Sequence, residues 1–381
     1  MGKLVNKINV LFVVMHLKGG GSERLVHNLA LKLDRKFFNP SIAYFFEDGA
    51  LKEFSKYEIP LYHVPKNKRF DISTIKGIGE IIRKNNIHIV NAHHFMPMVY
   101  SFYGSKVKNN CKLIYTEHAK SEVDKILWKW QKIGGYLLNR SDAAVGVTGE
   151  VSEAIHNKFK LHSSKVFTIK NGVDLNAYRD SNNKEKLKKE LGIAEDEKVI
   201  GIVANLKRIK NHFFLLKAFE KLTKKNNKVK LFLVGQGFEN DPENTEEELR
   251  IFVDKNGLKE KVLFLGYRAD IPDLLNIMDI FCLTSFKEGL PISLIEAMAA
   301  GLPIVGTDVE GIRDVISHNK NGFLIQLDDM DGLRSALQKL LHDESLRQRF
   351  AQESKLIART YSLGQCVSEY ENLFFCKSPK A

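Results

Sequence analysis

The sequence predicts an α/β protein made of two doubly wound, Rossmann-like parallel-sheet domains. Its 381 residues exceed what one hydrophobic core usually supports. Short apolar, β-branched runs alternate with longer amphipathic stretches, as in parallel sheets with helical crossovers. This alternation ends near residue 170 and restarts near residue 198, which indicates two consecutive domains that face each other across a cleft.

The first domain is expected to span 1–174 and to contain seven strands. These strands are predicted at 8–15, 40–46, 60–64, 87–92, 112–116, 143–147 and 165–169. Helices are predicted between them at 22–34, 72–85, 97–107, 122–139 and 150–159.

The second domain is expected to span 175–360. Its strands are predicted at 198–204, 229–234, 262–265, 279–283 and 303–306, and its helices at 211–226, 244–256, 270–277, 291–300 and 328–342. The charged stretch 180–189 marks the expected linker region. Two further helices are expected within 343–376, with a break near Tyr361, so that the terminal segment 361–381 packs on the first domain. Residues 171–180 and the break near Tyr361 are the expected hinges for closure around a ligand.

Composition favours a cytoplasmic protein. No run of eighteen uncharged apolar residues predicts a transmembrane helix. The apolar stretch 8–17 resembles a signal sequence, but it contains Asn9 and His16 and suits a buried first strand better. The four cysteines are scattered, without metal-ligand or disulfide-scaffold spacing.

The net charge of +12 lies entirely in the first domain. Residues 1–174 hold 27 Lys and Arg against 15 Asp and Glu, whereas residues 175–381 hold 31 of each. A positive field concentrates anionic partners such as a lipid surface, a polyphosphate or nucleic acid. A solvated, lysine-rich surface without a partner is the alternative, and no nucleic-acid recognition motif accompanies the lysines.

The loop Gly19–Glu23 follows the first predicted strand. Its glycines permit a close backbone approach, and the amides at the start of the next helix favour an anion such as a phosphate. It is not the dinucleotide fingerprint, which argues against an oxidoreductase. The structural alternative is a tight turn with Ser22 as helix N-cap.

The strongest single feature is the segment 285–301, Ser-Phe-Lys-Glu-Gly-Leu-Pro-Ile-Ser-Leu-Ile-Glu-Ala-Met-Ala-Ala-Gly. Glu296 lies in a helix that is otherwise small or apolar, where an unpaired carboxylate is costly. Ribose hydroxyls could satisfy it, because a carboxylate accepts two hydroxyls at once; a buried lysine or arginine is the alternative partner. Glu288 would lie near the helix N-terminus, where diphosphate charge is favourable.

With these residues the chain resembles the family 4 glycosyltransferases of the GT-B fold, over essentially its whole length. The pair Glu288 and Glu296 with the surrounding segment is that family's most specific signature. Further matches are the loop 19–23, Asn-Gly-Val-Asp at 171–174, Val-Gly-Gln-Gly at 234–237, Phe-Leu-Gly at 264–266 and Gly-Thr-Asp at 306–308, leading to Gly311.

The resemblance implies a retaining transfer from a nucleotide-diphosphate sugar, with UDP as the favoured nucleotide, to a glycan that is often lipid-linked. Such a reaction belongs to the synthesis of a cell-surface polysaccharide such as lipopolysaccharide or capsule. Glu296 would bind the ribose, Glu288 the transferred sugar and Lys210 the diphosphate. The donor-side backbone positions are Gly20, Gly21, Gly266, Gly289, Leu290, Pro291 and Ile292, with Arg268 among the donor-side side chains.

One position departs from the family. An arginine commonly stands five residues before the lysine, and here that residue is Asn205. Lys207 or Arg208 could supply the missing charge, which is needed because the leaving nucleotide develops negative charge.

The histidines that follow strands are the remaining candidates. The resemblance places His118 near the donor sugar, which makes His118, Glu288 and Lys210 the candidate catalytic residues. His93 and His94 follow the preceding strand and are acceptor-side or structural candidates.

No metal or other cofactor is expected. The Asp-x-Asp sequence Asp329-Met330-Asp331 could suggest a metal site, but it begins a predicted helix and suits capping of that helix. Lys210 and backbone amides would handle the phosphate charge instead.

Both tryptophans lie among lysines in 125–132, a pattern that favours contact with an anionic membrane and a location at the inner face of the cytoplasmic membrane. The alternative is an ordinary amphipathic helix with its tryptophans packed on the sheet. Two other functions stay open: a nucleotide-sugar epimerase of the same fold, and a non-catalytic sugar-binding subunit.

Overall fold

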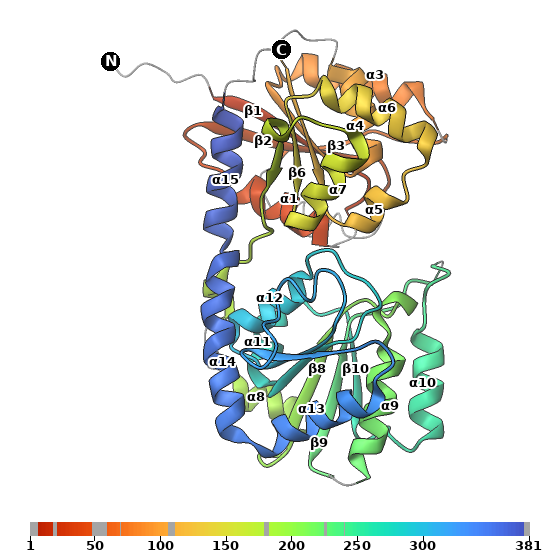
Figure 1. Cartoon of the computed structure of the whole chain (residues 1–381), viewed down its shortest axis with the longest axis vertical. Coiled ribbons are helices and arrows are strands. Elements are labelled where there is room, and N and C mark those ends of the chain that lie inside the picture. Colours follow the sequence, from red (N-terminus) through yellow and green to blue (C-terminus); the bar gives the residue numbers. More distant parts are fainter. Residues whose placement is uncertain are drawn as a thin grey trace. The chain divides into compact units, whose positions relative to one another are not determined.

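The computed structural model describes residues 7–17, 21–47, 59–68, 70–105, 111–178, 183–224, 227–239 and 241–376. The chain divides into two compact units (Figure 1). Unit 1 comprises Met1–Gly172 with Leu363–Ala381, and unit 2 comprises Val173–Ser362. Helix α15 (Leu363–Phe375) therefore belongs to the first unit.

Unit 1 contains a seven-stranded parallel sheet with the strand order β3-β2-β1-β4-β5-β6-β7. The strands are β1 (Ile8–Val14), β2 (Phe38–Tyr44), β3 (Leu61–His63), β4 (Ile89–His93), β5 (Lys112–Glu117), β6 (Ala143–Gly146) and β7 (Val166–Thr168). The helices are α1 (Gly21–Lys32), α3 (Ile72–Lys84), α4 (Phe95–Ser105), α5 (Lys120–Asp124), α6 (Trp128–Asn139), α7 (Gly149–Phe159) and α15 (Leu363–Phe375), with the 3-10 turn η1 (Ser163–Lys165).

Alternation along the strands divides the core of unit 1 between the two faces of the sheet. In β1, Phe12 belongs to a cluster with residues of α1 and α15, whereas Leu11 and Val13 belong to a cluster with residues of α3, α4, α6 and α7. Successive strand side chains point to opposite faces, so both faces of this sheet must be apolar and covered. Helices α1 and α15 cover one face, and the other four cover the opposite face.

Unit 2 contains a six-stranded parallel sheet with the order β10-β9-β8-β11-β12-β13. The strands are β8 (Lys198–Val203), β9 (Val229–Val234), β10 (Val262–Gly266), β11 (Ile280–Leu283), β12 (Ile304–Thr307) and β13 (Gly322–Ile325). The helices are α8 (Lys184–Glu190), α9 (His212–Thr223), α10 (Glu246–Lys255), α11 (Ile271–Ile277), α12 (Ile292–Ala299), α13 (Met330–His342) and α14 (Glu344–Ala358); the 3-10 turns are η2 (Leu175–Tyr178), η3 (Arg208–Lys210) and η4 (Arg359–Tyr361).

Both sheets reverse their strand order once, between β1 and β4 in unit 1 and between β8 and β11 in unit 2. Parallel α/β sheets bind ligands outside the carboxyl ends of their strands, at such a reversal. Each unit therefore has one edge where a ligand is expected, and the loops after β1, β4 and β5 and after β8 and β11 lie at these edges.

The predicted strands agree with the observed ones to within two residues at each end. Two other predictions were wrong, and one strand was missed. The single helix expected at 122–139 is two helices, α5 and α6, separated at 125–127. The expected linker contains α8. The side chain of Leu187, the one large apolar residue of this helix, is buried. The edge strand β13 was not predicted. This strand begins at Gly322. Glycine is needed at that position because a Cβ there would lie 2.2 Å from the Ile304 carbonyl oxygen of the neighbouring strand.

Two smaller expectations are settled by local structure. Asp329 caps α13 by accepting a hydrogen bond from Gly332 N, which confirms the capping interpretation. Ser22 lies inside the first turn of α1 and donates to Glu23 Oε2, so it is not the N-cap. Among the described residues, no helix combines the length and apolarity needed to cross a lipid bilayer.

Candidate active site

A cluster of histidines and one carboxylate lies at the carboxyl ends of β4 and β5 in unit 1. Glu117, the last residue of β5, is 1% exposed. Its Oε1 accepts hydrogen bonds from His94 Nδ1 at 2.8 Å and from His118 N at 2.8 Å, and its Oε2 accepts one from the Tyr115 hydroxyl at 2.8 Å. The carboxylate thus fixes the backbone and side chains of the loops that follow both strands.

Glu117 is buried, and its partner His94 has a side chain that is 30% exposed. Burial acts to raise the pKa of Glu117, but His94 outweighs it, so the pKa is lowered. For His94, burial acts to lower the pKa, and the Glu117 charge outweighs it, so the pKa is raised. The backbone of His94 has φ 72°, a left-handed conformation that is uncommon for a residue other than glycine. Strain at such a position is typical of functional loops.

His93 and His118 stack beside this pair. Their ring centroids are 5.2 Å apart, and His93 Nδ1 lies 2.9 Å from His118 Nε2. Burial, followed by the charge of His94, lowers the pKa of His93 to about 3. Burial also lowers the pKa of His118 well below its usual range. Both rings are therefore neutral at physiological pH, next to His94, whose pKa is raised.

The structure brings together Lys210, Ser285 and Glu288 in unit 2. Lys210 ends η3 after β8, and Glu288 lies in the loop between β11 and α12. Lys210 Nζ donates to both carboxylate oxygens of Glu288, at 2.7 and 2.9 Å, and the Ser285 hydroxyl donates to Oε1 at 2.5 Å. The Glu288 side chain is 9% exposed and that of Lys210 is 25% exposed, so the pair is shielded but reachable.

The loop 289–292 leads from this pair into α12. Pro291 is the residue before the helix and Ile292 its first residue, while Leu290 is buried. Gly311 packs against the loop with φ 78°, and a Cβ there would lie 1.7 Å from the Gly289 carbonyl oxygen. Only glycine permits this approach, which holds the loop backbone at the helix N-terminus.

Glu296 lies within α12, one turn beyond the helix start, and is 2% exposed. Its Oε1 accepts a 2.7 Å hydrogen bond from the hydroxyl of Tyr178, which ends η2. The Tyr178 hydroxyl thereby orients one oxygen of this buried carboxylate.

The other charged donor-side candidates are held by nearby carboxylates. Lys207 pairs with Asp241 at 2.6 Å, Arg208 pairs with Glu248 at 3.2 Å, and Arg268 pairs with Asp270 at 2.5 Å. Lys210 is thus the candidate cation that the structure places against Glu288.

The remaining donor-side positions are backbone or neutral residues. Asn205 is exposed in the loop after β8, and Gly266 ends β10 with φ 63°. Gly21 begins α1, and Gly20 lies outside the described residues.

Sequence reasoning missed four residues that position these groups: Tyr115, Glu117, Tyr178 and Ser285. Glu117 gave a detectable signal, since it is a carboxylate at the end of an apolar strand, directly before His118. Tyr178 gave none, because its contact with Glu296 joins positions 118 residues apart.

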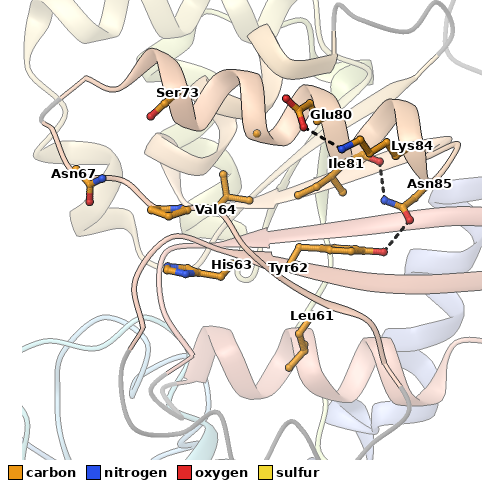
Figure 2. A pocket seen from close by; sticks show the side chains of 12 residues that line it. Leu61, Tyr62, His63, Val64, Asn67, Ser73, Glu80, Ile81, Lys84 and Asn85 are labelled. Carbon is orange, nitrogen blue, oxygen red and sulfur yellow. Dashed lines mark hydrogen bonds and ion pairs between the residues drawn. The ribbon is translucent and has the colours of Figure 1, made fainter.

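An open groove of about 600 Å³ lies elsewhere in unit 1, between the edge strand β3 and α3 (Figure 2). Tyr62 and Asn85 line it and are joined by a 3.0 Å hydrogen bond, and the Lys84–Glu80 pair lies at its rim. It contains none of the candidate residues, so its surface provides positions for control substitutions.

Two family models match the chain. The model described as "Glycosyltransferase Family 4" matches residues 19–177, and that described as "Glycosyl transferases group 1" matches residues 183–356. Together they cover most of units 1 and 2.

Curated relatives are similar over most of their length. The N-acetyl-alpha-D-glucosaminyl L-malate synthase of Bacillus anthracis is 27% identical over 87% of this chain and 84% of its own. The UDP-Gal:alpha-D-GlcNAc-diphosphoundecaprenol alpha-1,3-galactosyltransferase of Escherichia coli is 26% identical over 86% and 87%.

Solved structures agree in fold. Alr3699/HepE of Anabaena, crystallised in complex with UDP and glucose, superposes with a TM-score of 0.84 at 21% identity, over 96% of this chain and 99% of that one. A glycosyltransferase from Rickettsia africae superposes with a TM-score of 0.86 at 22% identity, over 98% and 100%. With two parallel-sheet units, two matching family models and these relatives, the chain belongs to the family 4 glycosyltransferases of the GT-B fold.

Proposed function

We propose that this glycosyltransferase moves a hexose-type sugar from a UDP-sugar to a lipid-linked glycan, with retention of anomeric configuration and without a metal ion, in the synthesis of a cell-surface polysaccharide such as lipopolysaccharide or capsule. The observation that carries the proposal is the Lys210–Glu288–Ser285 cluster beside the N-terminus of α12. UDP is proposed because the name of the Escherichia coli relative specifies a UDP-sugar and the Anabaena structure contains UDP. The lipid-linked acceptor is proposed from the name of the same relative.

Lys210 can serve the donor diphosphate without leaving Glu288. An ammonium group has three N–H donors, and the two contacts with Glu288 use two of them. The third can meet a phosphate oxygen while the carboxylate keeps the ammonium in position. When the bond between the anomeric carbon and the phosphate oxygen breaks, negative charge grows on the leaving diphosphate, and a preorganised cation stabilises it.

The start of α12 supplies further positive potential. Its first amides carry the positive end of the helix dipole, and the loop at Gly289 brings the backbone to that point. Lysine and backbone donors together can therefore take the role that a divalent ion has in other transferases, which is the physical basis for proposing metal independence.

Glu288 and Glu296 are assigned to hydroxyl groups of the donor. Glu288 is oriented by Ser285 and Lys210 and would accept from the transferred sugar. Glu296 would accept from the ribose beside its Tyr178 contact, because a carboxylate has about four acceptor positions. In unit 1, His118 is assigned to the donor sugar and His94, whose side chain is 30% exposed, to the acceptor side. His93 is fully buried between Asn91 and His118, so of its two candidate roles, acceptor-side or structural, the structural one is assigned.

Helix α6 is proposed to contact an anionic membrane where the acceptor is anchored. Leu127, Trp128 and Tyr136 are 61%, 64% and 56% exposed. Lys129 and Lys132 each lie 5.5 Å from the Trp128 ring centre, and the Arg140 guanidinium lies 3.8 Å from that of Tyr136. Exposed aromatic rings with adjacent cations suit the headgroup region of a bilayer. Trp130 is different, since its ring packs edge-on against Phe95 of α4.

A panel of nucleotide sugars tests the donor and the metal requirement. UDP-glucose, UDP-galactose, UDP-N-acetylglucosamine and GDP-mannose are incubated with the chain and an undecaprenyl-diphosphate-linked GlcNAc acceptor, with and without EDTA. We expect transfer from one UDP-sugar that EDTA leaves unchanged. Lys210→Ala should lower kcat/KM by about 100-fold, because one preorganised donor to a developing charge contributes that much.

The matched control is Lys84→Ala, which removes a lysine from the rim of the β3–α3 groove and should leave kcat/KM unchanged (Figure 2). Loss of activity in EDTA that Mg²⁺ restores would contradict metal independence. An epimerised nucleotide sugar without transfer would identify an epimerase, and absence of nucleotide binding by calorimetry would indicate a non-catalytic subunit.

A further inference from the structure

Three side chains of unit 1 form a hydrogen-bonded chain that ends at His118. Asn91 and His93 lie on β4, two residues apart and therefore on the same face of the sheet, and both are fully buried. Asn91 Oδ1 lies 3.0 Å from His93 Nε2, and His93 Nδ1 lies 2.9 Å from His118 Nε2. The direction of these hydrogen bonds decides which nitrogen of His118 carries its proton.

The backbone sets that direction at the buried end of the chain. Asn91 Nδ2 lies 3.4 Å from the Ile114 carbonyl oxygen and 2.9 Å from Thr116 Oγ1. A carbonyl oxygen can only accept, so the amide nitrogen of Asn91 must face it. The amide oxygen of Asn91 must then face His93, where it is an acceptor.

Each later proton position follows from the one before it. His93 Nε2 donates to the Asn91 oxygen, and because His93 is neutral, its Nδ1 carries no proton and accepts. His118 Nε2 must therefore be the donor to His93 Nδ1. Since His118 is neutral as well, its Nδ1 is left as an unprotonated acceptor.

That Nδ1 atom is buried and has no hydrogen-bond partner in the part of the chain that the structure describes. A buried acceptor without a partner is destabilising, because it has given up its hydrogen bond to water. The Glu117 hydrogen bond to the backbone N–H of His118 fixes the loop that holds the ring, so the ring cannot easily turn away to find a partner of its own.

We propose that Asn91 and His93 are positioning residues that hold His118 in the Nε2–H form, so that its Nδ1 accepts a hydrogen bond from a hydroxyl of the donor sugar. This assignment rests on the proposed glycosyl transfer and explains why hydrogen bonds link Asn91, His93 and His118 one after another. His94 supports it, because its positive charge, 4.9 Å away between ring centres, opposes protonation of His118.

The protonation of His118 can be measured without substrate. Two-bond ¹H–¹⁵N correlation spectra of the full chain with ¹⁵N-labelled histidine distinguish protonated from unprotonated ring nitrogens, and loss of signals in His118→Asn assigns that ring. We expect a protonated Nε2 and an unprotonated Nδ1 in the unmodified chain. A protonated Nδ1, or an equal mixture of the two neutral forms, would overturn the proposal. This test needs no variant of His93.

Two substitutions at position 93 separate positioning from packing. A glutamine side chain carries an amide donor and a carbonyl acceptor, so His93→Gln can keep both hydrogen bonds, whereas His93→Phe fills the space and keeps neither. We expect His93→Gln to retain the Nε2–H form of His118 and kcat/KM to within about twofold. His93→Phe should mix the two forms and lower kcat/KM by about tenfold, with thermal unfolding checked for both. Equal kcat/KM values for the two variants would contradict the proposal.

The hydroxyl contact has its own test. The donor that the panel identifies among UDP-glucose, UDP-galactose and UDP-N-acetylglucosamine should shift the Nδ1 signal of His118, and UDP alone should not. An identical response to UDP would refute a sugar contact. Failure of transfer with every donor would refute the proposed function, while the spectrum of the unliganded chain would still decide the proton positions.

Discussion

Glu117 organises the histidines of unit 1 at the scale of single residues. It receives three hydrogen bonds in a position that is almost fully buried, and its charge raises the pKa of His94. Removing one member of a buried ion pair costs more than the pair contributes, because the remaining charge is left without a partner. The strand end therefore combines His94, whose pKa is raised, with two neutral imidazoles, His93 and His118, within one hydrogen-bonded group.

The neutral histidines make stability depend on pH. His93 has a folded pKa of about 3, below the unfolded value of about 6.5, so the unfolded chain binds its proton first as the pH falls. The stability that this group contributes is present above pH 6.5 and is lost between pH 6.5 and about 3. Glutamine cannot titrate. Between pH 5.5 and 4, the free energy of unfolding should therefore fall less steeply with falling pH for His93→Gln than for the parent chain, and the two slopes should differ by about 1.4 kcal/mol per pH unit. Urea unfolding at several pH values measures both slopes, and parallel slopes would show that His93 is protonated in the folded state.

Helix α6 shows at the element scale why one predicted helix became two. The chain between α5 and α6 turns at 125–127, and Leu127 has an extended conformation before Trp128 begins the new helix. The turn gives α6 its own direction, with Leu137 and Leu138 buried and Trp128, Ile133 and Tyr136 exposed. A face with large exposed apolar side chains on a folded unit indicates a contact surface.

Co-sedimentation with vesicles tests that surface. We expect the chain to bind vesicles of phosphatidylcholine with about 30% phosphatidylglycerol more strongly than vesicles of phosphatidylcholine alone, since each nearby cation contributes about 1 kcal/mol at an anionic surface. The double variant Trp128→Ser with Tyr136→Ser should lose most of this binding. Phe375→Ser, which changes an exposed aromatic residue of α15, is the control. Equal binding of the double variant and the parent would exclude α6 as the contact.

The terminal helix α15 matters at the scale of the whole molecule, because it completes a core built mainly from residues before position 172. Tyr370 and Phe374 are buried on the face of the sheet that α1 also covers, and Phe374 packs on Phe12 and Phe38. Unit 1 is therefore complete only when the last helix of the chain has been made. Unit 2, in contrast, is continuous in sequence.

A core substitution in α15 should destabilise unit 1 selectively. Phe374→Ala removes a buried ring and should cost about 3–5 kcal/mol. In calorimetry or hydrogen exchange, the loss should appear in β1 and β2, while the amides of β8 and β11 keep their protection. Phe350→Ala, in the core of unit 2, should give the converse pattern. Equal loss of protection in both units after either substitution would mean that they unfold as one.

The sequence by itself determined the fold class, the number of sheets, the strand positions and the segment that holds Glu288 and Glu296. These features depend on local information: apolar runs with the period of a buried strand, glycine and proline at helix ends, and a motif contained within seventeen residues. The family resemblance also indicated His118, which directly follows β5.

Only the tertiary structure decided which groups meet. The bonds from Lys210 to Glu288, from Tyr178 to Glu296 and from His118 to His93 join positions 78, 118 and 25 residues apart, and the packing of strands, helices and turns within each unit brings them together. The same holds for the burial of α15 on β1, for the edge strand β13 and for the exposed face of α6. Local pattern specifies how a segment is folded, but the partner of a side chain is set by the packing of segments that are distant in the sequence.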